Sequence, residues 1–466
     1  MRIHQSSMSE PRRSRLTGTY RERLRQLLSE DLDFHSEDSK YASHNFHSFP
    51  AKFPPQLPAK FIQELTAAGE TVLDPMSGSG TTVVEAHLAG RHGIAFDIDP
   101  LAVLIGRVKT TPLDQSAVRK AGTEVLRKAM RSVSTRREAL LSSLTHRWDR
   151  STRDFVDYWF AAEVQVELAA IYGAIQQVQD SAVRAFLELA LSAIIITKSG
   201  GVSFAFDLAH TRPHRAKIAL DQNGEVIYGQ ELLQDPSPRV KLLTKTLKSP
   251  IEEFRRRLAS NLRYIPSPEL GQPPYIGFGD AQSLPLLDST VDLIVTSPPY
   301  ASNAIDYMRA HKFSLVWLGY DVGELGCMRR EYVGGEALSG CIFESLPPLT
   351  AAIVDEVTAK DPRRGGVLHR YYSEMTRVIR EMYRVLRPNK AAVVVVGSSV
   401  MRGVDTRTGD CLAEIGESVG FEVPAIGIRN IDRDRRMLPA GGTINMSSQI
   451  QNRMHQESVI GFLKPE

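Results

Sequence analysis

Cysteine is scarce in this chain of 466 residues: Cys327, Cys341 and Cys411 are its three cysteines, and they lie far apart. This spacing excludes a disulfide scaffold and a cysteine-rich zinc site, and it suits a reducing compartment. Long apolar runs are also missing, because the best candidate, residues 185–196, is short and contains Glu188, which predicts a buried helix. The first residues lack the apolar core of a secretory signal, so we expect a cytoplasmic protein without a membrane partner.

Basic and acidic residues nearly balance, with a net charge of +3, but the charges are unevenly distributed along the chain. Residues 110–270 carry 23 basic and 18 acidic side chains, which indicates an anionic partner or simply a solvated helical surface. The length exceeds what one compact core usually holds, so we expect one large domain with an insertion, or two domains.

Strands and helices begin to alternate near residue 71. Apolar residues 71–73 predict a strand, a glycine turn follows, residues 83–89 predict a helix, and residues 93–96 predict a second strand that ends at Asp97. This order is typical of a parallel α/β nucleotide-binding sheet. Helical patterns such as 155–179 and 182–197 then replace the strands, which resume at 275–278, 291–296, 391–396, 421–423 and 458–462.

The sequence therefore predicts an α/β fold with a large, mainly helical insertion. Residues 1–40 are expected to form a tail and a short helix, residues 41–109 and 271–466 the α/β domain, and residues 110–270 the helical insert. A segment rich in glycine and charge, residues 323–364, is expected to be a mobile loop.

The glycine turn reads Asp74-Pro75-Met76-Ser77-Gly78-Ser79-Gly80-Thr81. No lysine follows Gly80, which excludes a Walker phosphate loop, and no third glycine completes the dinucleotide fingerprint. Glycine still lets a ligand approach the backbone at a helix N-terminus. Asp97, 17 residues after Gly80, stands where an acid accepts hydrogen bonds from ribose hydroxyls. A plain strand-to-helix turn is the alternative.

Two further features follow predicted strands. Asp280 is placed to accept a hydrogen bond from an adenine amino group, although a turn or capping aspartate has the same pattern. Ser297-Pro298-Pro299-Tyr300 follows the strand 291–296, and its prolines cannot continue a sheet ladder, so they fix a rigid loop. Its hydroxyl, free carbonyls and aromatic face suit an exocyclic amino group on an extruded base. In isolation the same four residues are an ordinary proline-rich turn.

Together these motifs resemble the S-adenosylmethionine-dependent amino-methyltransferases of DNA, which make N4-methylcytosine or N6-methyladenine. The turn at 74–81 is similar to the family's first motif, and Ser297–Tyr300 is similar to its Ser/Asn/Asp-Pro-Pro-Tyr/Phe catalytic motif. The stretch 47–54 resembles the motif that closes over the methionine end of the cofactor, and residues 454–460 resemble the last strand. The resemblance covers roughly residues 44–108 and 272–465, and it implies a Rossmann-like class I methyltransferase fold.

The resemblance also implies roles for individual residues. The catalytic residues it implies are Ser297, Pro298, Pro299 and Tyr300. The residues it implies for binding S-adenosyl-L-methionine are Phe49, Lys52, Asp74, Pro75, Ser77, Gly78, Gly80, Thr81, Asp97 and Asp280. No metal is required. Serine in the first catalytic position is the form usual among N4-cytosine enzymes, which favours cytosine N4 over adenine N6 in double-stranded DNA. The three cysteines do not follow proline, which argues against cytosine-C5 methylation.

The insert at 110–270 is expected to read the DNA target or to be purely structural. Candidate phosphate contacts are Arg212, His214, Arg215 and Lys217 on a predicted loop, and Arg255 and Arg256. A cognate restriction endonuclease is an expected partner of a site-specific DNA methyltransferase. Two other functions stay open: an RNA amino-methyltransferase, and a non-catalytic nucleic-acid-binding regulator on the same fold.

Overall fold

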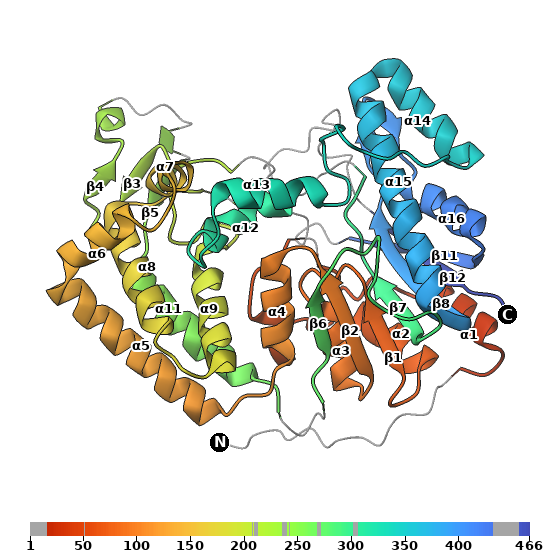
Figure 1. Cartoon of the computed structure of the whole chain (residues 1–466), viewed down its shortest axis with the longest axis horizontal. Helices are drawn as coiled ribbons and strands as arrows, with labels where there is room; N and C mark the ends of the chain where they lie inside the picture. Colours follow the sequence, from red (N-terminus) through yellow and green to blue (C-terminus); the bar gives the residue numbers. More distant parts are fainter. Residues whose placement is uncertain are drawn as a thin grey trace.

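A seven-stranded sheet forms the centre of the computed structural model, which describes residues 16–50, 52–206, 208, 213–234, 240–241, 243–267, 272–301, 306–431 and 456–466 (Figure 1). Its strand order is β11-β12-β8-β7-β1-β2-β6. The strands are β1 (Thr71–Asp74), β2 (His92–Asp97), β6 (Tyr275–Phe278), β7 (Val291–Thr296), β8 (Leu386–Gly397), β11 (Glu422–Asn430) and β12 (Gln456–Leu463). The first five pair in parallel, and β12 is antiparallel to both of its neighbours. This is the predicted Rossmann-like sheet.

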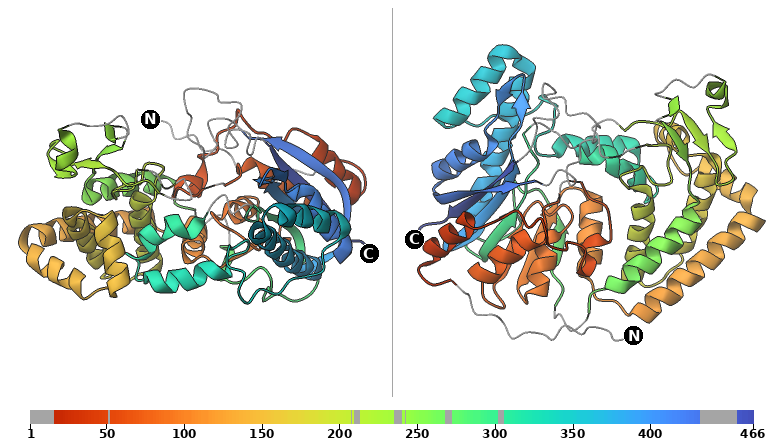
Figure 2. Two further views of the ribbon diagram at one scale, coloured as in Figure 1. Left: turned by 90° about the horizontal axis from the view of Figure 1, so that it is seen from above. Right: turned by 180° about the vertical axis from the view of Figure 1, so that it is seen from behind.

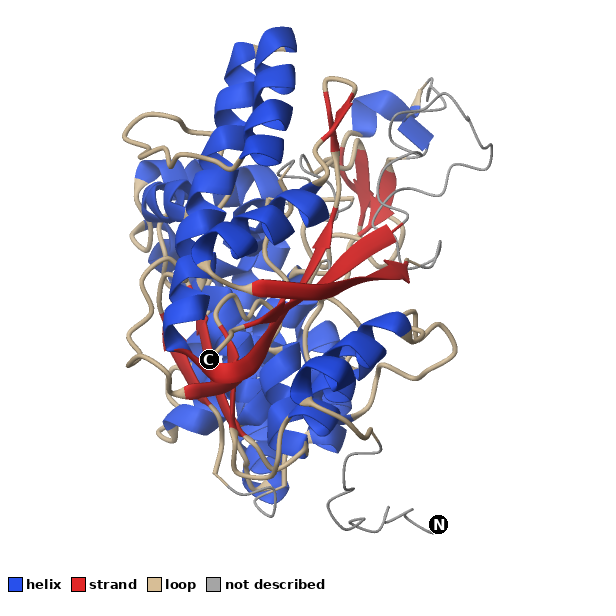
Figure 3. Ribbon diagram, turned by 90° about the vertical axis from the view of Figure 1, so that its right-hand side faces the viewer, coloured by secondary structure: helices blue, strands red, loops and turns tan. Residues whose placement is uncertain are grey.

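Successive residues of a strand point to opposite sides of the sheet, and in the buried strands consecutive residues are apolar. Both faces of the sheet are therefore apolar. Val72 and Leu293 pack in one cluster, whereas Leu73 and Ile294 pack in the other. Helices cover the two faces, as Figure 3 shows. On one side lie α1 (Tyr20–Ser29), α2 (Gln56–Leu65) and α3 (Thr81–Leu88), and on the other α14 (Pro348–Lys360), α15 (Pro362–Val385) and α16 (Thr408–Val419).

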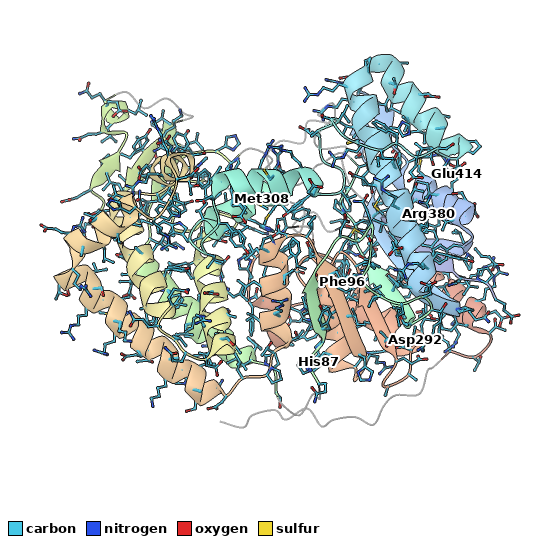
Figure 4. The ribbon with its side chains drawn as sticks, viewed as in Figure 1. His87, Phe96, Asp292, Met308, Arg380 and Glu414 are labelled. Atoms are coloured by element: carbon cyan, nitrogen blue, oxygen red, sulfur yellow. The ribbon has the colours of Figure 1, made fainter. Side chains whose placement is uncertain are left out.

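Carboxylates fix the ends of several elements. Asp292, at the start of β7, accepts a hydrogen bond from the Thr71 amide at 3.0 Å and pairs with Arg387 at 2.7 Å. Glu414 of α16 accepts the Leu349 amide at 2.8 Å, in the first turn of α14. These contacts tie β7 to the start of β1 and hold α14 against α16; Figure 4 labels both acids.

The insertion lies between α4 (Pro100–Thr110) and β6, and it is mainly helical as predicted. Its helices are α5 (Gln115–Thr135), α6 (Arg137–Thr145), α7 (Arg150–Trp159), α8 (Ala162–Ile175), α9 (Ser181–Ile195) and α11 (Pro250–Asn261). The single helix expected over 155–179 is two helices, because Phe160 and Ala161 adopt extended backbone angles. Short 3-10 turns are η1 (Ala42–Asn45), η2 (Gln230–Leu233) and η3 (Leu262–Tyr264).

A small sheet inside the insertion was not predicted. Its strands are β3 (Ile218–Leu220), β4 (Val226–Tyr228) and β5 (Thr244–Thr246). Each strand has three residues, too few to show an alternating apolar pattern. The Nζ of Lys245 in β5 donates to three carbonyls of the Gly200–Gly201 turn region, those of Ser199, Ser203 and Ala205, at 2.6–2.9 Å. The small sheet is thereby joined to the chain that leaves α9.

The insertion shares one apolar core with helices of the α/β domain. A single cluster of buried side chains includes Leu101 and Ile105 of α4, Phe186 of α9 and Trp317, which follows α12 (Tyr307–Leu315). The ring of Phe186 meets the ring of Phe46 edge to face, with centroids 5.6 Å apart. The two views of Figure 2 show α4, α9 and α12 between the large sheet and the outer helices of the insertion. The insertion therefore packs against the rest of the chain through an extended apolar contact.

The segment 323–364 is not the predicted loop. It contains α13 (Val322–Glu331) and α14, and α15 begins at Pro362. The Gly334 amide donates to Glu374 at 2.7 Å, and Glu374 pairs with Arg370 at 2.7 Å, so α15 also holds the residues that follow α13. Glycine and charge in this segment hid helices that long-range contacts stabilise.

The remaining strands, β9 (Val400–Met401) and β10 (Val404–Asp405), form a hairpin between β8 and α16. Within the ranges given above, no helix is both long enough and apolar enough to cross a bilayer. Residues 1–15 of the predicted tail lie outside the described residues; the predicted short helix is α1.

The shared core predicts that Phe186→Ala destabilises the whole chain. Phe186 is 1 % exposed, and truncating a buried phenylalanine costs about 3–5 kcal/mol. We expect one urea unfolding transition that shifts as a unit, and Tyr264→Ala, at a 43 % exposed aromatic of the same insertion, to change stability by about 0.5 kcal/mol or less. A separate early transition of the insertion alone, with the rest unchanged, would contradict a shared core.

Candidate active site

A pocket lies at the edge of the sheet where four parallel strands end. β1, β2, β6 and β7 finish at Asp74, Asp97, Phe278 and Thr296, and residues at or just after these ends line the pocket. It opens to solvent, and the space between its lining residues is about 880 Å³ with that opening included. From β1 the chain moves outward to β2 and β6 and then returns to β7 on the other side of β1. Such a reversal is where open α/β sheets bind ligands.

The pocket gathers most residues that the sequence motifs singled out. All of the predicted cofactor contacts except Gly80 line it: Phe49, Lys52, Asp74, Pro75, Ser77, Gly78, Thr81, Asp97 and Asp280. Ser297 and Pro299 of the predicted catalytic loop line the same pocket, whereas Pro298 and Tyr300 do not.

The turn after β1 requires glycine at two positions. Gly78 has φ +47°, and a Cβ there would lie 3.1 Å from the ring of Phe49. Gly80, with φ +71°, is the N-cap of α3, and a Cβ there would lie 3.1 Å from the Cα of Gly106 in α4. Gly80 therefore acts by close helix packing, while Gly78 allows an aromatic side chain to cover the turn.

Asp97 is held by the backbone of this turn. Its Oδ2 accepts the Gly78 amide at 2.7 Å and its Oδ1 accepts the Asp99 amide at 2.9 Å. Burial, with the neighbouring charge of Asp99, raises the pKa of Asp97 to about 7. Burial also raises the pKa of Asp74 to about 6. The pocket thus holds two carboxyl groups that titrate near neutrality.

Aromatic and basic side chains form a second wall. Phe49 stacks on Tyr307 of α12, with ring centroids 5.4 Å apart and an interplanar angle of 28°. The Nζ of Lys52 donates to the carbonyl of His44 at 3.0 Å. Burial lowers the pKa of Lys52. These contacts anchor the residues before α2 over the glycine turn.

Asp280 and the proline loop complete the pocket. Asp280 accepts the amide of Gln282 at 2.9 Å, which is a turn contact, and the Gly279 amide donates to the carbonyl of Asp97 at 3.1 Å. Ser297 is partly exposed and Pro298 is buried, so the loop presents its hydroxyl side to the pocket. The Tyr300 hydroxyl is directed elsewhere: it donates to Glu457 Oε1 at 2.5 Å.

Sequence reasoning missed several residues of this site. Lys109 is 1 % exposed and donates from Nζ to the carbonyl of Ser79 at 2.6 Å, which supports the glycine turn from behind. Burial, with the charge of Lys52, holds the pKa of Lys109 well below its ordinary value. A lysine near the end of an apolar helix normally indicates a solvated helix end, so no local signal distinguished it.

A buried pair links the pocket to α12. Asp99 caps α4 through the Leu101 amide at 2.8 Å and meets His311 Nδ1 at 2.5 Å. The ring of His311 in turn lies 5.2 Å from that of Phe49. Glu331, Tyr332 and Val333, at and after the end of α13, also line the pocket. His311 and residues 331–333 come more than 200 residues after the glycine turn, which is why spacing could not reveal them.

The predicted phosphate contacts are not part of this pocket. Arg212 lies outside the described residues. His214 and Lys217 flank the start of β3, and the guanidinium of Arg215 lies 4.0 Å from the ring centroid of Tyr228 and also contacts Tyr158 and Phe204. Arg255 and Arg256 pair with Glu252 and Glu253 one turn earlier in α11. The charge of these two arginines is therefore compensated locally.

The pocket residues fit S-adenosylmethionine. Ser77 is 5 % exposed, and its Oγ has no hydrogen-bond partner in the part of the chain that the structure describes. This orphaned hydroxyl, together with Lys52, suits the amino-acid end of the cofactor, and the carboxylate of Asp97 suits a ribose diol. No group of three or more metal-ligating side chains occurs among the described residues.

Comparisons by sequence relate this chain to DNA methyltransferases. Residues 4–106 match the N6/N4 methyltransferase family, described as DNA methylase. The type II methyltransferase M.MvaI of Kocuria varians is 22 % identical over 401 residues, covering 82 % of this chain and 83 % of that protein. M.BsoBI of Geobacillus stearothermophilus is 23 % identical, covering 81 % and 78 %. Among solved structures, a TehB-like S-adenosylmethionine-dependent methyltransferase from Corynebacterium glutamicum is 9 % identical with a TM-score of 0.27, covering 87 % of this chain and 86 % of that chain.

The sheet order and the pocket residues fit an S-adenosylmethionine-dependent methyltransferase. Residues 4–106 match the DNA methylase family of N6 and N4 methyltransferases, and most of the chain is similar to type II methyltransferases.

Asp97 predicts a pH-dependent affinity for S-adenosylmethionine. Because its pKa is about 7, the Asp97 carboxylate, which the sequence predicts to accept the ribose hydroxyls, is mostly protonated at pH 6 and mostly ionised at pH 8. Affinity measured by calorimetry should rise across this interval. Asp97→Asn should weaken binding about 10-fold at pH 8, the loss of one charge-assisted hydrogen bond, and should remove the rise centred near pH 7.

Two comparisons make this measurement specific. A residual dependence centred near pH 6 is expected from Asp74. Asp355→Asn, at an exposed aspartate of α14, is the matched control and should leave both affinity and pH profile unchanged. An Asp97→Asn variant with the wild-type pH profile would show that another group binds the ribose.

Proposed function

We propose that this protein transfers a methyl group from S-adenosylmethionine to the N4 amino group of cytosine in double-stranded DNA. The observation that supports it is the position of Ser297: it stands first in the Pro-Pro-Tyr loop and lines the same pocket as the glycine turn and Asp97. Serine at this position is the form usual among N4-cytosine enzymes, as noted above. A base extruded from the duplex would reach this loop from the open side of the pocket.

The proposed reaction needs no covalent intermediate between the protein and its substrates. The cofactor supplies an electrophilic methyl group on a positively charged sulfur. The amino nitrogen donates its lone pair to the methyl carbon as the carbon–sulfur bond breaks, and the nitrogen then loses one proton to solvent. Ser297 Oγ and the main-chain carbonyls of the loop accept hydrogen bonds from the amino group, which frees the lone pair from the ring. Positioning and exclusion of water supply the remaining rate enhancement.

Two further assignments belong to this proposal. We assign target recognition to the insertion, residues 110–270, because it packs beside the pocket and carries a net positive charge. His214 and Lys217 are its candidate phosphate contacts, whereas the local ion pairs of Arg255 and Arg256 weaken their candidacy. The relatives M.MvaI and M.BsoBI are type II methyltransferases, which supports a role beside a restriction endonuclease.

The product identifies the target base. Purified protein incubated with S-adenosylmethionine and mixed-sequence DNA should yield N4-methylcytosine when the DNA is digested and its nucleosides are separated by mass spectrometry. N6-methyladenine instead would keep the mechanism and refute the assignment to cytosine.

An RNA control run alongside separates the other functions. Methylated nucleosides in RNA with none in DNA would identify an RNA enzyme. If the DNA contains every short recognition sequence and the protein binds the cofactor but methylates neither nucleic acid, a non-catalytic regulator would be favoured.

Tyr300→Ala should reduce methylation far more than cofactor binding. Stacking of a base on an aromatic ring is worth about 1–3 kcal/mol, so kcat/KM for DNA should fall about 10–100-fold. Tyr300 does not line the cofactor pocket, so the Kd for S-adenosylmethionine should stay within about twofold of the wild type. Equal losses in both quantities would argue against contact between Tyr300 and the base.

A further inference from the structure

Three strands bring Tyr300 together with residues from the end of the chain. Arg429 of β11 is the cross-strand partner of Glu457 in β12, and Glu457 is the partner of Gly397 in β8. Directly opposed residues share one face of a sheet, so these three positions form a row across the three strands. Tyr300, at the end of the catalytic loop, lies over the Gly397 end of this row.

Gly397 leaves the space that the tyrosine ring fills. A Cβ on Gly397 would lie 2.9 Å from Cε2 of Tyr300 and 3.3 Å from its Cδ2 and Cζ, which is closer than ordinary contact. Gly397 is not in the left-handed region of backbone space, so the turn geometry does not require glycine here. The close approach of the ring is what excludes a side chain.

The row also fixes the hydroxyl of the ring. Tyr300 Oη donates to Glu457 Oε1 at 2.5 Å, while the other carboxylate oxygen of Glu457 pairs with Arg429. Arg429 is 4 % exposed and Glu457 is 7 % exposed, so this is a buried ion pair with a third polar partner. Burial and the negative charge of Glu457 raise the pKa of Tyr300 well above its ordinary value, which keeps the hydroxyl as a donor.

Stability does not explain this arrangement well. A buried ion pair is often no more stabilising than apolar residues of the same size, because both charges lose their hydration. What the pair does supply is a directional acceptor at a fixed place. Tyr300 remains partly exposed while its hydroxyl and one side of its ring are held.

We propose that Glu457 and Gly397 are positioning residues that fix the ring of Tyr300, so that its exposed part presents a rigid surface to the target base. The inference rests on the proposed function and adds residues from β8 and β12 to the catalytic apparatus. Glu457 acts through the Tyr300 hydroxyl, and Arg429 orients the carboxylate of Glu457.

A double-mutant cycle tests whether Glu457 acts through that hydroxyl. The variants are Tyr300→Phe, Glu457→Gln and the two combined, and the readout is the single-turnover rate of methyl transfer to DNA at saturating substrates. Each single variant should transfer methyl about 10-fold more slowly, the loss of one charged hydrogen bond, with the Kd for S-adenosylmethionine unchanged. The double variant should be no slower than either single variant.

Two more variants separate positioning from folding. Gly397→Ala leaves every charge in place but intrudes on the ring, and it should also slow transfer about 10-fold while the chain stays folded, with a melting temperature lowered by a few degrees at most. Glu422→Gln is the matched control: it lies at the far end of β11 in an exposed pair with Arg21, and its transfer rate should equal that of the wild type.

The outcomes distinguish this inference from the proposed function. Additive losses in the cycle, or wild-type rates in both Glu457→Gln and Gly397→Ala, would overturn the positioning role while leaving the methyltransferase assignment intact. A folded wild type that transfers no methyl group to DNA would overturn both. If Glu457→Gln fails to fold, the rate of Gly397→Ala alone decides.

Discussion

The site depends on the place where the carboxyl ends of β1, β2, β6 and β7 converge. Because the strand order reverses around β1, the loops after these strands diverge and leave a space between them instead of covering one another. The side chains that fill this edge come from short loops on rigid strands. Gly78 and Gly80 are needed for the same reason, since any bulk there would press Phe49 or α4 away from the edge. The pocket is thus a property of the topology that the local residues refine.

Buried charge is concentrated around this space. Asp74, Asp97, Asp99 and Lys52 line the pocket, and Lys109 lies behind the glycine turn. Burial keeps the pKa values of Asp74 and Asp97 close to neutrality, so a positively charged group that enters the pocket favours their ionised forms. Ionisation of these two carboxyl groups is therefore coupled to the binding of a cationic ligand.

Motifs that act through local backbone geometry could be predicted from the sequence. The glycine turn, Asp97 and the Ser297–Tyr300 loop each follow a short apolar strand, and a parallel sheet must bring such ends together. Partners defined by long-range packing could not be predicted. Nothing near Lys109 shows that its helix end is buried under Ser79, and nothing near His311 shows that it meets Asp99. The same limit hid α13 and α14, whose glycine and charged residues indicate a loop. In the structure α14 packs against α15, and Leu325 of α13 belongs to the core that includes the insertion.

The contact between Phe46 and Phe186 affects which segments of this chain can be exchanged with those of a relative. Phe46 lies three residues before Phe49, and Phe186 belongs to the insertion, so one short loop faces the cofactor with one side chain and the insertion with another. A chimaera that exchanged residues 111–264 with those of a relative would leave this loop and α12 facing an unfamiliar surface. If the insertion recognises the target as proposed, the unit to exchange in this chain is the insertion together with residues 42–49 and α12.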